Sequence, residues 1–154
     1  MKKFADPASR AAFSYRDDPD IPAFDDAFWH VVMDDRCGLC ARTARRIAHL
    51  DRLDRVRIVP LRSALGTGLM RHYGLDPSNP QSWLLIRHGT ARAGFDAAMH
   101  LFPDLSDIYT PLLMLKILPS TWREALYAWI ARHRYAWFGR TDLCALPDPQ
   151  VQAR

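Results

Sequence analysis

Residues 28–40 read FWHVVMDDRCGLC, and this stretch decides the fold. Its first half, residues 28–33, is a short apolar run that predicts a buried strand. Two cysteines three residues apart follow, at the start of a helical pattern in which Cys40, Ala44 and Ile47 recur on one face. A strand that leads into a Cys-x-x-Cys pair at a helix start is the arrangement that dithiol–disulfide chemistry requires.

The two thiols are expected to act as a redox pair. A helix N-terminus carries roughly half a positive charge, which stabilises the reactive thiolate form of cysteine. Three-residue spacing puts both sulfurs on one face of the first turn, close enough for a disulfide. We expect Cys37 to be the nucleophile at an exposed tip, with its pKa lowered by the helix terminus, by Arg36 and by the neighbouring thiol. Cys40 should point toward the core and act as the resolving thiol.

Three neighbouring residues are candidates for supporting roles. Gly38 is expected to let a substrate backbone come close, and Leu39 to offer a small apolar contact. Asp34 has two open interpretations: it accepts a proton from Cys40, or it fixes the loop by accepting backbone N–H bonds.

A lone Cys-x-x-Cys pair is also half of a zinc site, and this alternative needs two more ligands. Cys144 with His30, His49 or His133 would complete a set, but no spacing supports it. We therefore expect neither a metal nor a cofactor. Cys144 itself is a third redox thiol, a contact to the active site or a buried filler, and the filler interpretation is favoured.

Composition indicates one soluble domain in a chain of 154 residues. Residues 1–27 are polar and form an extension that is either disordered or wrapped on the surface, and a single compact domain is expected over 28–150. The formal charge is +4, but the arginines are scattered along the chain. We interpret them as solvated surface residues and expect no nucleic-acid partner.

The cysteine count and the absence of apolar runs predict the compartment. Three cysteines are too few for a secreted disulfide scaffold and leave one unpaired, which favours a reducing compartment. No apolar signal-peptide region follows the first residues, and no run is long enough for a transmembrane segment. The expected localisation is cytoplasmic.

The remaining pattern predicts a strand–helix–strand unit, then a helix, a hairpin and further helices. The expected elements are a first helix ending between 50 and 54, a strand over 56–60, a helix after Ser63 that Gly74 stops, strands over 83–86 and 90–93, and helices over 96–101, 107–118 and from 121 onward. This order gives a small mixed sheet flanked by helices, an α/β thioredoxin-like fold with a helical C-terminal half.

The last helix carries two further expectations. Thr121 and Glu124 match a capping box at its start. One face is shared by Trp122, Ala125, Leu126, Trp129, Ile130 and His133. We expect an aromatic core patch with flanking arginines, rather than a stacking platform for nucleic acid, from Trp129, Tyr135, Trp137 and Phe138 with Arg132 and Arg134.

These motifs resemble the DCC family of predicted thiol-disulfide oxidoreductases, which is named for an Asp-x-x-Cys-x-x-Cys motif, here Asp34, Cys37 and Cys40. The chain departs from the usual motif at Met33, Asp35 and Arg36. The resemblance covers roughly 29–150, and its other matching positions are Ser82, Gly94, Asp96-Ala97-Ala98, Leu118-Pro119, Tyr127–Ala131, Arg134-Tyr135, Phe138-Gly139, Cys144 and Pro147.

The resemblance implies an enzyme with a thioredoxin-like fold that exchanges disulfides with a disulfide-containing protein or a small thiol, and an unidentified reductase that recycles it. Thioredoxins place a cis-proline just before the third strand. Pro80 is the nearest candidate, but Gln81 intervenes, so we expect Ser82 or Trp83 to occupy that space. The alternatives are a binding or adaptor module of the same fold without turnover and, less favoured, a metal-binding protein.

Overall fold

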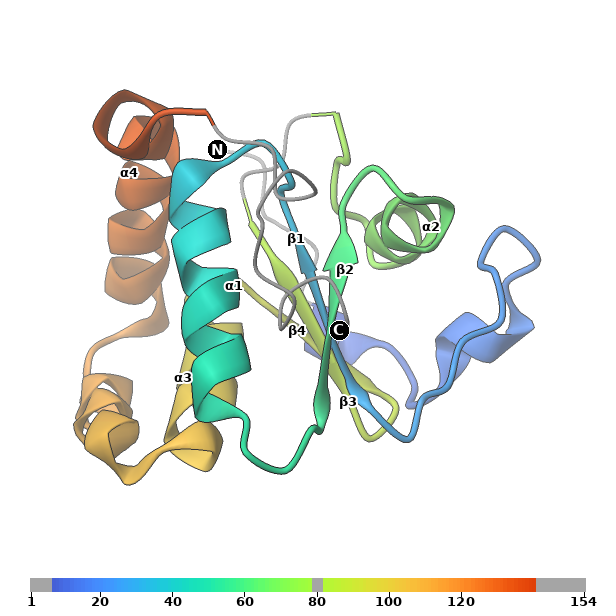
Figure 1. The fold of residues 1–154 in the computed structure, drawn as a ribbon, viewed down its shortest axis with the longest axis horizontal. Helices are drawn as coiled ribbons and strands as arrows, with labels where there is room; N and C mark the ends of the chain where they lie inside the picture. The colour runs from blue at the N-terminus through green and yellow to red at the C-terminus, as the bar shows by residue number, and fades with distance from the viewer. Residues whose placement is uncertain (1–6, 79–81, 141–154) are drawn as a thin grey trace.

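The computed structural model describes residues 7–78 and 82–140. These residues form a four-stranded mixed sheet in the order β2-β1-β3-β4 (Figure 1). Strand β1 (Trp29–Met33) pairs in parallel with β2 (Val56–Pro60) and antiparallel with β3 (Leu84–Arg87), which pairs in turn with β4 (Thr90–Ala93). A parallel βαβ unit followed by a hairpin is the thioredoxin-like arrangement, so the expected α/β fold is confirmed.

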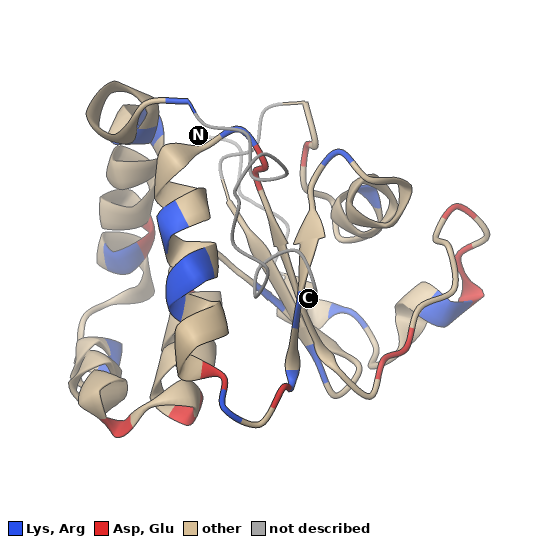
Figure 2. Ribbon diagram, in the orientation of Figure 1, with Lys and Arg blue, Asp and Glu red and all other residues tan. Residues whose placement is uncertain are grey.

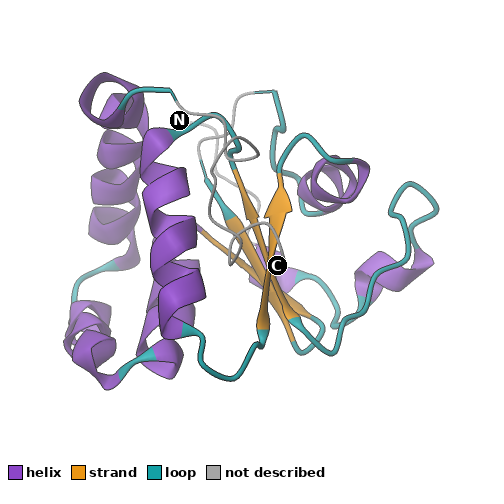
Figure 3. Cartoon of the chain, in the orientation of Figure 1, coloured by secondary structure: helices purple, strands orange, loops and turns teal. Residues whose placement is uncertain are grey.

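The helices cover both faces of the sheet (Figure 3). Helices α1 (Gly38–Leu50), α3 (Gly94–Leu105) and α4 (Ser120–Phe138) lie together on one side, and α2 (Ala64–His72) lies on the other. A 3-10 helix, η3 (Asp107–Ile117), connects α3 to α4, and two short 3-10 helices precede the sheet, η1 (Pro7–Ser9) and η2 (Ser14–Asp17). Among the described helices, none is both long and apolar enough to cross a bilayer.

Successive residues of β1 contribute to two hydrophobic clusters, one on each face of the sheet. Trp29, Val31 and Met33 join the cluster under α1 and α3, whereas Val32 joins the cluster under α2. Successive strand residues point to opposite faces, so a strand buried on both sides is apolar throughout. This explains why the run before the cysteines is continuous rather than alternating.

The described part of the N-terminal extension, residues 7–27, lies against the sheet. Tyr15 is buried in the α2-side cluster, and its hydroxyl donates to Asp26 over 3.0 Å. The backbone N–H of Phe13 donates to the Gly89 carbonyl over 2.8 Å, which holds the extension at the β3–β4 hairpin.

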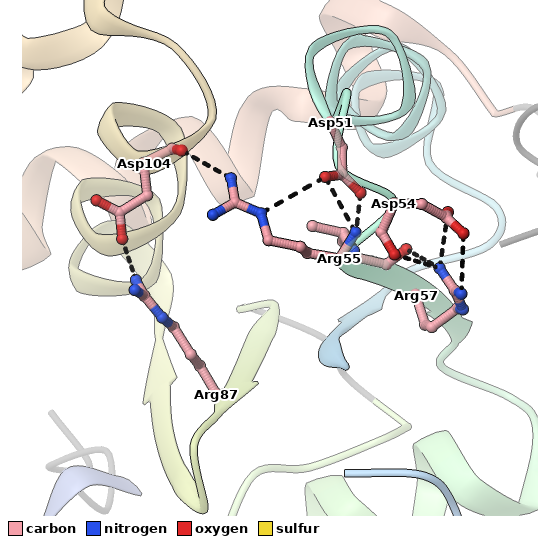
Figure 4. Close-up of polar contacts among 7 residues, drawn as sticks. Asp51, Asp54, Arg55, Arg57, Arg87 and Asp104 are labelled. Carbon is pink, nitrogen blue, oxygen red and sulfur yellow. Dashed lines mark hydrogen bonds and ion pairs between the residues drawn. The ribbon is translucent and has the colours of Figure 1, made fainter. Parts of the chain in front are cut away.

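Paired charges fix the end of the sheet that is far from the cysteines (Figure 4). The buried carboxylate of Asp51 accepts the backbone N–H groups of Arg55 and Val56 at 3.1 and 2.8 Å, which turns the chain from α1 into β2. The side chain of Arg87 pairs with Asp104 at the end of α3. The Asp51 contacts lead the chain from α1 into β2, and the two cysteines lie at the opposite end of α1.

Several local expectations agree with the structure. The Ser63 hydroxyl caps α2 by accepting the Gly66 N–H over 3.0 Å. Gly74 follows α2 with a φ of 71°, and His88 and Gly89 turn between β3 and β4 with φ values of 50° and 76°.

The C-terminal half departs from the prediction in three ways. Helix α3 begins at Gly94 and continues past Pro103 to Leu105, since a proline in the last turn removes a single hydrogen bond. The 107–118 segment is a 3-10 helix that contains Pro111 rather than an α-helix. The capping box is wrong, because α4 begins at Ser120, directly after Pro119, and no side chain caps it.

Candidate active site

The dithiol lies where β1 passes into α1. Cys37 is the N-cap residue, with φ −98° and ψ 120°, and its carbonyl accepts the first helical bond from the Ala41 N–H over 2.9 Å. Cys37 and Cys40 are both free thiols. Cys40 is buried in the cluster under α1, in the direction that its helical spacing predicts.

The expectation that Cys37 sits at an exposed tip is wrong, because its exposed fraction is 0%. The residues after α4 lie directly on it: the Gly38 N–H donates to the Gly139 carbonyl over 3.2 Å, and Cys37 and Arg140 form an antiparallel bridge. We call residues 138–140 the cover. They are about a hundred residues away in the sequence, so the local pattern around Cys37 holds no sign of them.

The two residues between the cysteines both contact other parts of the chain. A Cβ atom on Gly38 would lie 2.2 Å from the Phe138 carbonyl oxygen, so the absent side chain makes room for the cover. Leu39 packs against the core cluster, and its carbonyl accepts the Thr43 hydroxyl over 2.9 Å. The space beside Gly38 is therefore filled by the cover, whereas Leu39 is only half-buried and its contact with a substrate stays a prediction.

Asp34 is the centre of a hydrogen-bond network under the loop. One carboxylate oxygen accepts the Arg36 backbone N–H at 3.1 Å and lies 3.3 Å from an Arg62 guanidinium nitrogen. The other lies 3.3 Å from Arg134 Nη2 and accepts the Tyr135 hydroxyl. With these partners, the buried carboxylate holds the loop and joins it to α4.

Arg134 lies in the interior, although the helical pattern places it on the surface. It was expected among arginines that flank an aromatic patch, yet it is 5% exposed and ion-paired with Asp34. Arg36, expected to be the cation beside Cys37, is exposed to solvent, and the guanidinium that lowers the pKa of Cys37 is that of Arg134. An arginine on a helix reads as a surface residue, so only the family resemblance pointed to Arg134 and Tyr135.

The two thiols have opposite pKa shifts. A hydrogen bond from the Cys40 thiol is the largest of the causes that lower the pKa of Cys37 to about 6; backbone N–H bonds and Arg134 add to it, and burial opposes it. The same hydrogen bond, together with burial, raises the pKa of Cys40. A proton shared in this way favours the thiolate at Cys37 and the protonated thiol at Cys40.

Ser82 and Trp83 lie against Tyr127 of α4, and Trp83 also packs against the cluster that contains both cysteines. The Tyr127 hydroxyl is in hydrogen-bond contact with the Ser82 side chain and the Trp83 backbone, and burial raises the pKa of Tyr127. The Cys40 sulfur raises the pKa of Tyr127 further, which indicates that this group of side chains adjoins the dithiol. Pro80 and Cys144 lie outside the described residues.

No group of three or more His, Cys, Asp and Glu side chains comes together within residues 7–78 and 82–140. The zinc alternative therefore finds no ligand set in that part of the chain.

Comparison with known proteins adds independent information about this site. Residues 31–140 match the family described as DCC1-like thiol-disulfide oxidoreductase. The chain is 27% identical over 124 residues to the uncharacterized protein YuxK of Bacillus subtilis (strain 168), covering 80% of this chain and 90% of that protein.

A second relative is the DCC family protein At1g52590, chloroplastic, of Arabidopsis thaliana, with 29% identity over 118 residues that cover 75% of this chain and 68% of that protein. No solved structure matches. The family match spans more than half of the chain and contains Asp34, both thiols, Arg134 and the cover. The chain belongs to the DCC1-like thiol-disulfide oxidoreductase family.

Proposed function

We propose that the protein is a thiol-disulfide oxidoreductase in which Cys37 is the nucleophile and Cys40 the resolving thiol. The observation that carries the proposal is the opposite ionisation of two adjacent thiols, with the pKa of Cys37 lowered to about 6 and that of Cys40 raised. At neutral pH this arrangement supplies a thiolate for attack and keeps its partner protonated until it is needed.

The reaction proceeds in two exchanges. The Cys37 thiolate attacks one sulfur of a substrate disulfide, a new S–S bond forms, and the other substrate sulfur leaves as a thiolate. Cys40 then loses its proton and attacks the Cys37 sulfur, which releases the second substrate thiolate. Two electrons pass to the substrate, and a Cys37–Cys40 disulfide remains for an external dithiol reductase to reduce.

The first exchange also activates Cys40. The hydrogen bond to Cys37 is the largest cause of its raised pKa, and that cause disappears when Cys37 becomes part of a mixed disulfide. Arg134, which lowers the pKa of both thiols, then favours the Cys40 thiolate. Asp34 serves as a positioning residue, because it holds both Arg134 and the loop that carries Cys37.

Exchange at Cys37 requires the cover to open, because its sulfur is sealed and a disulfide has to approach it in line. One described backbone hydrogen bond, from Gly38 to Gly139, ties the cover to α1. The Cys37–Arg140 bridge and the contact of Arg42 with the Phe138 ring also hold the cover. Local opening breaks these contacts alone and costs less than global unfolding. We infer that a substrate meets Cys37 in an open form.

The burial of Cys37 also fits the alternative function, a binding module without turnover. A module that binds partners without turnover would keep its thiols sealed, and an exposed fraction of 0% at Cys37 is what it would show. The lowered pKa weighs against this alternative, since a purely structural buried cysteine has its pKa raised by burial.

Trapping of mixed disulfides separates the two functions. In a Cys144→Ser background, which leaves only the two site thiols, Cys40→Ser should accumulate a mixed disulfide with a disulfide-bonded protein or with oxidised glutathione. Cys37→Ser in the same background should trap nothing. Equal amounts of trapped mixed disulfide in the two variants, or none in either, would favour the binding module.

We place this activity in the reducing cytoplasm. The support is the small, odd cysteine count, which leaves one thiol unpaired when Cys37 and Cys40 pair. In that compartment a recycling reductase would keep Cys37 and Cys40 reduced between turnovers.

A further inference from the structure

The C-terminal elements expose an unusual amount of apolar surface. Helix η3 contains six Ile, Leu and Met side chains in 11 residues, and none of its residues is buried. Of the ten large hydrophobic side chains that are exposed in the described part of the chain, eight belong to the segment from η3 to α4. We call these eight the apolar surface: Ile108, Met114, Ile117, Leu118, Trp122, Leu126, Trp129 and Trp137.

On α4 the apolar surface is a continuous stripe. Trp122, Leu126, Trp129 and Trp137, with His133 between the last two, follow the three- and four-residue spacing of one helix face. The rings of Trp129 and Trp137 contact each other at 5.0 Å between centroids, and the two side chains are 45% and 51% exposed. The rings of Trp129, His133 and Trp137 contact one another, and no element among the described residues covers the stripe.

Basic residues outnumber acidic residues on the helices that lie on the same side of the molecule. Without the buried Arg134, α1, η3 and α4 carry six Lys and Arg against two Asp and Glu, and α3 on the same side adds Asp96 and Asp104. Figure 2 shows the basic residues of α1 next to α4. The fold brings the arginines of α1 beside α4, since α1 packs on α4 although the two are far apart in the chain.

Two contacts join the basic residues of α1 to the C-terminal elements. The Arg42 guanidinium lies 5.4 Å from the Phe138 ring, and Arg46 Nε donates to the Tyr109 hydroxyl over 2.8 Å. The basic row therefore borders the elements that carry the apolar surface.

These basic side chains differ from those at the opposite end of the sheet. Within residues 7–78 and 82–140, no ion pair to Asp or Glu involves Arg42, Arg45, Lys116 or Arg132. At the far end, by contrast, Arg57 and Arg87 are paired with Asp54 and Asp104 (Figure 4). The one acidic residue of α4, Glu124, lies on the side of the helix opposite the tryptophan stripe by helical spacing.

We propose that the apolar surface and the bordering basic residues dock the protein onto an anionic lipid surface. Tryptophan is the side chain that membrane–water interfaces favour, and aliphatic neighbours add buried area just below the headgroups. Arg42, Arg45, Lys116 and Arg132 lie where they meet anionic headgroups. Docking is independent of the thiol chemistry, because no residue of the apolar surface belongs to the dithiol site.

The charges and side-chain types disfavour two other occupants. A second copy of the chain would bring two rows of unpaired arginines face to face, which like-charge repulsion opposes. A nucleic acid would find arginines and tryptophans, but Ile108, Met114 and Ile117 offer no planar surface for a base to stack on. Dimerisation and oligonucleotide binding are nevertheless outcomes that the experiment must detect.

Vesicle binding by the full chain tests the proposal. Co-sedimentation and tryptophan fluorescence are measured with phosphatidylcholine vesicles that contain or lack phosphatidylserine. We expect binding to the phosphatidylserine vesicles alone, a blue shift of the emission from the exposed tryptophans, and weakening by added salt.

Two pairs of variants sharpen the test. Trp129→Ser should weaken vesicle affinity about tenfold or more, whereas Leu53→Ser, at an exposed apolar residue outside the surface, should leave it unchanged. Removing two charges in Arg45→Gln/Arg132→Gln should weaken affinity roughly 25-fold. Arg71→Gln, on the exposed face of α2, should have no such effect.

Four results would overturn the proposal. The first is no binding to either vesicle by a folded chain. The second is a dimer whose interface protects Trp129, shown by light scattering and by loss of that dimer in Trp129→Ser. The third is binding to a single-stranded oligonucleotide that displaces the protein from phosphatidylserine vesicles. Unchanged vesicle affinity in a folded Trp129→Ser variant would equally contradict it.

Discussion

Two regions of this molecule carry the same kind of sequence pattern and use it in opposite ways. In the first, β1 and α1, apolar periodicity and burial coincide: Ala44 and Ile47 are fully buried and the arginines between them are exposed. In the second, η3 and α4, tryptophans face solvent and an arginine lies in the interior. An apolar stripe thus predicts that a helix face needs a partner, but it does not say that the partner is the chain's own core.

The inversion in α4 has a physical cause. Asp34, at the end of β1, is a buried carboxylate, and a buried charge requires a cation and hydrogen-bond donors. Arg134 and Tyr135 supply them, so the helix face that bears these polar groups turns inward. The tryptophan stripe is then left outside, where the proposed lipid surface would cover it.

Replacing the buried arginine should have the largest effect on stability. Arg134→Met removes one partner of a buried ion pair, which costs about 3–5 kcal/mol, toward the lower end here because Arg62 and Tyr135 still contact Asp34. Urea unfolding at neutral pH measures the loss. Arg132→Met, two residues away and exposed, is the matched control and should change stability by less than about 0.5 kcal/mol. Equal losses in the two variants would contradict the inversion.

Truncating one apolar residue in each region compares the two stripes directly. Ile47→Ala, in the α1 core, should cost about 2–5 kcal/mol of unfolding free energy. Leu126→Ala, on the exposed stripe of α4, should cost less than about 0.5 kcal/mol. A large loss for Leu126→Ala in the isolated protein would mean that the stripe is buried in solution.

The cover connects α4 to the start of α1, and a substitution at Gly139 should destabilise it. Its φ of 69° and ψ of −174° are open to glycine almost alone, and nothing lies within 4 Å of an added Cβ. Gly139→Ala therefore strains the cover by about 1–3 kcal/mol and should speed alkylation of Cys37 roughly fivefold or more.

Alkylation is measured in the Cys144→Ser background. Gly74→Ala, at a φ of 71° after α2, is the control, since it should lower stability without speeding alkylation of Cys37. If both variants labelled Cys37 at the same rate, the cover would not limit access.

The ionised thiol should also make the stability of the reduced protein depend on pH. The folded pKa of Cys37 lies below its ordinary value, so its contribution is present at high pH and is lost as pH falls through about 6. Unfolding free energy should rise on the order of 1 kcal/mol between about pH 6 and 7.5 relative to Cys37→Ser. Parallel pH profiles for the two proteins would show that the thiol is not ionised.

The same comparison explains what could be predicted from the sequence. The βαβ unit, the Ser63 cap and the His88-Gly89 hairpin follow from neighbours in the chain, and the structure agrees with them. The burial of Cys37, the inward position of Arg134 and the exposed tryptophans depend on contacts between segments about a hundred residues apart. Local periodicity carries no information about such contacts.

The central claim is that Cys37 is a stabilised thiolate at neutral pH. The most direct test is a titration of thiolate ultraviolet absorbance in the reduced Cys144→Ser protein, with Cys37→Ser in the same background as the blank. The account predicts a single transition near pH 6 that disappears in the blank. A transition near the ordinary value of 9.0, or no difference from the blank, would contradict it.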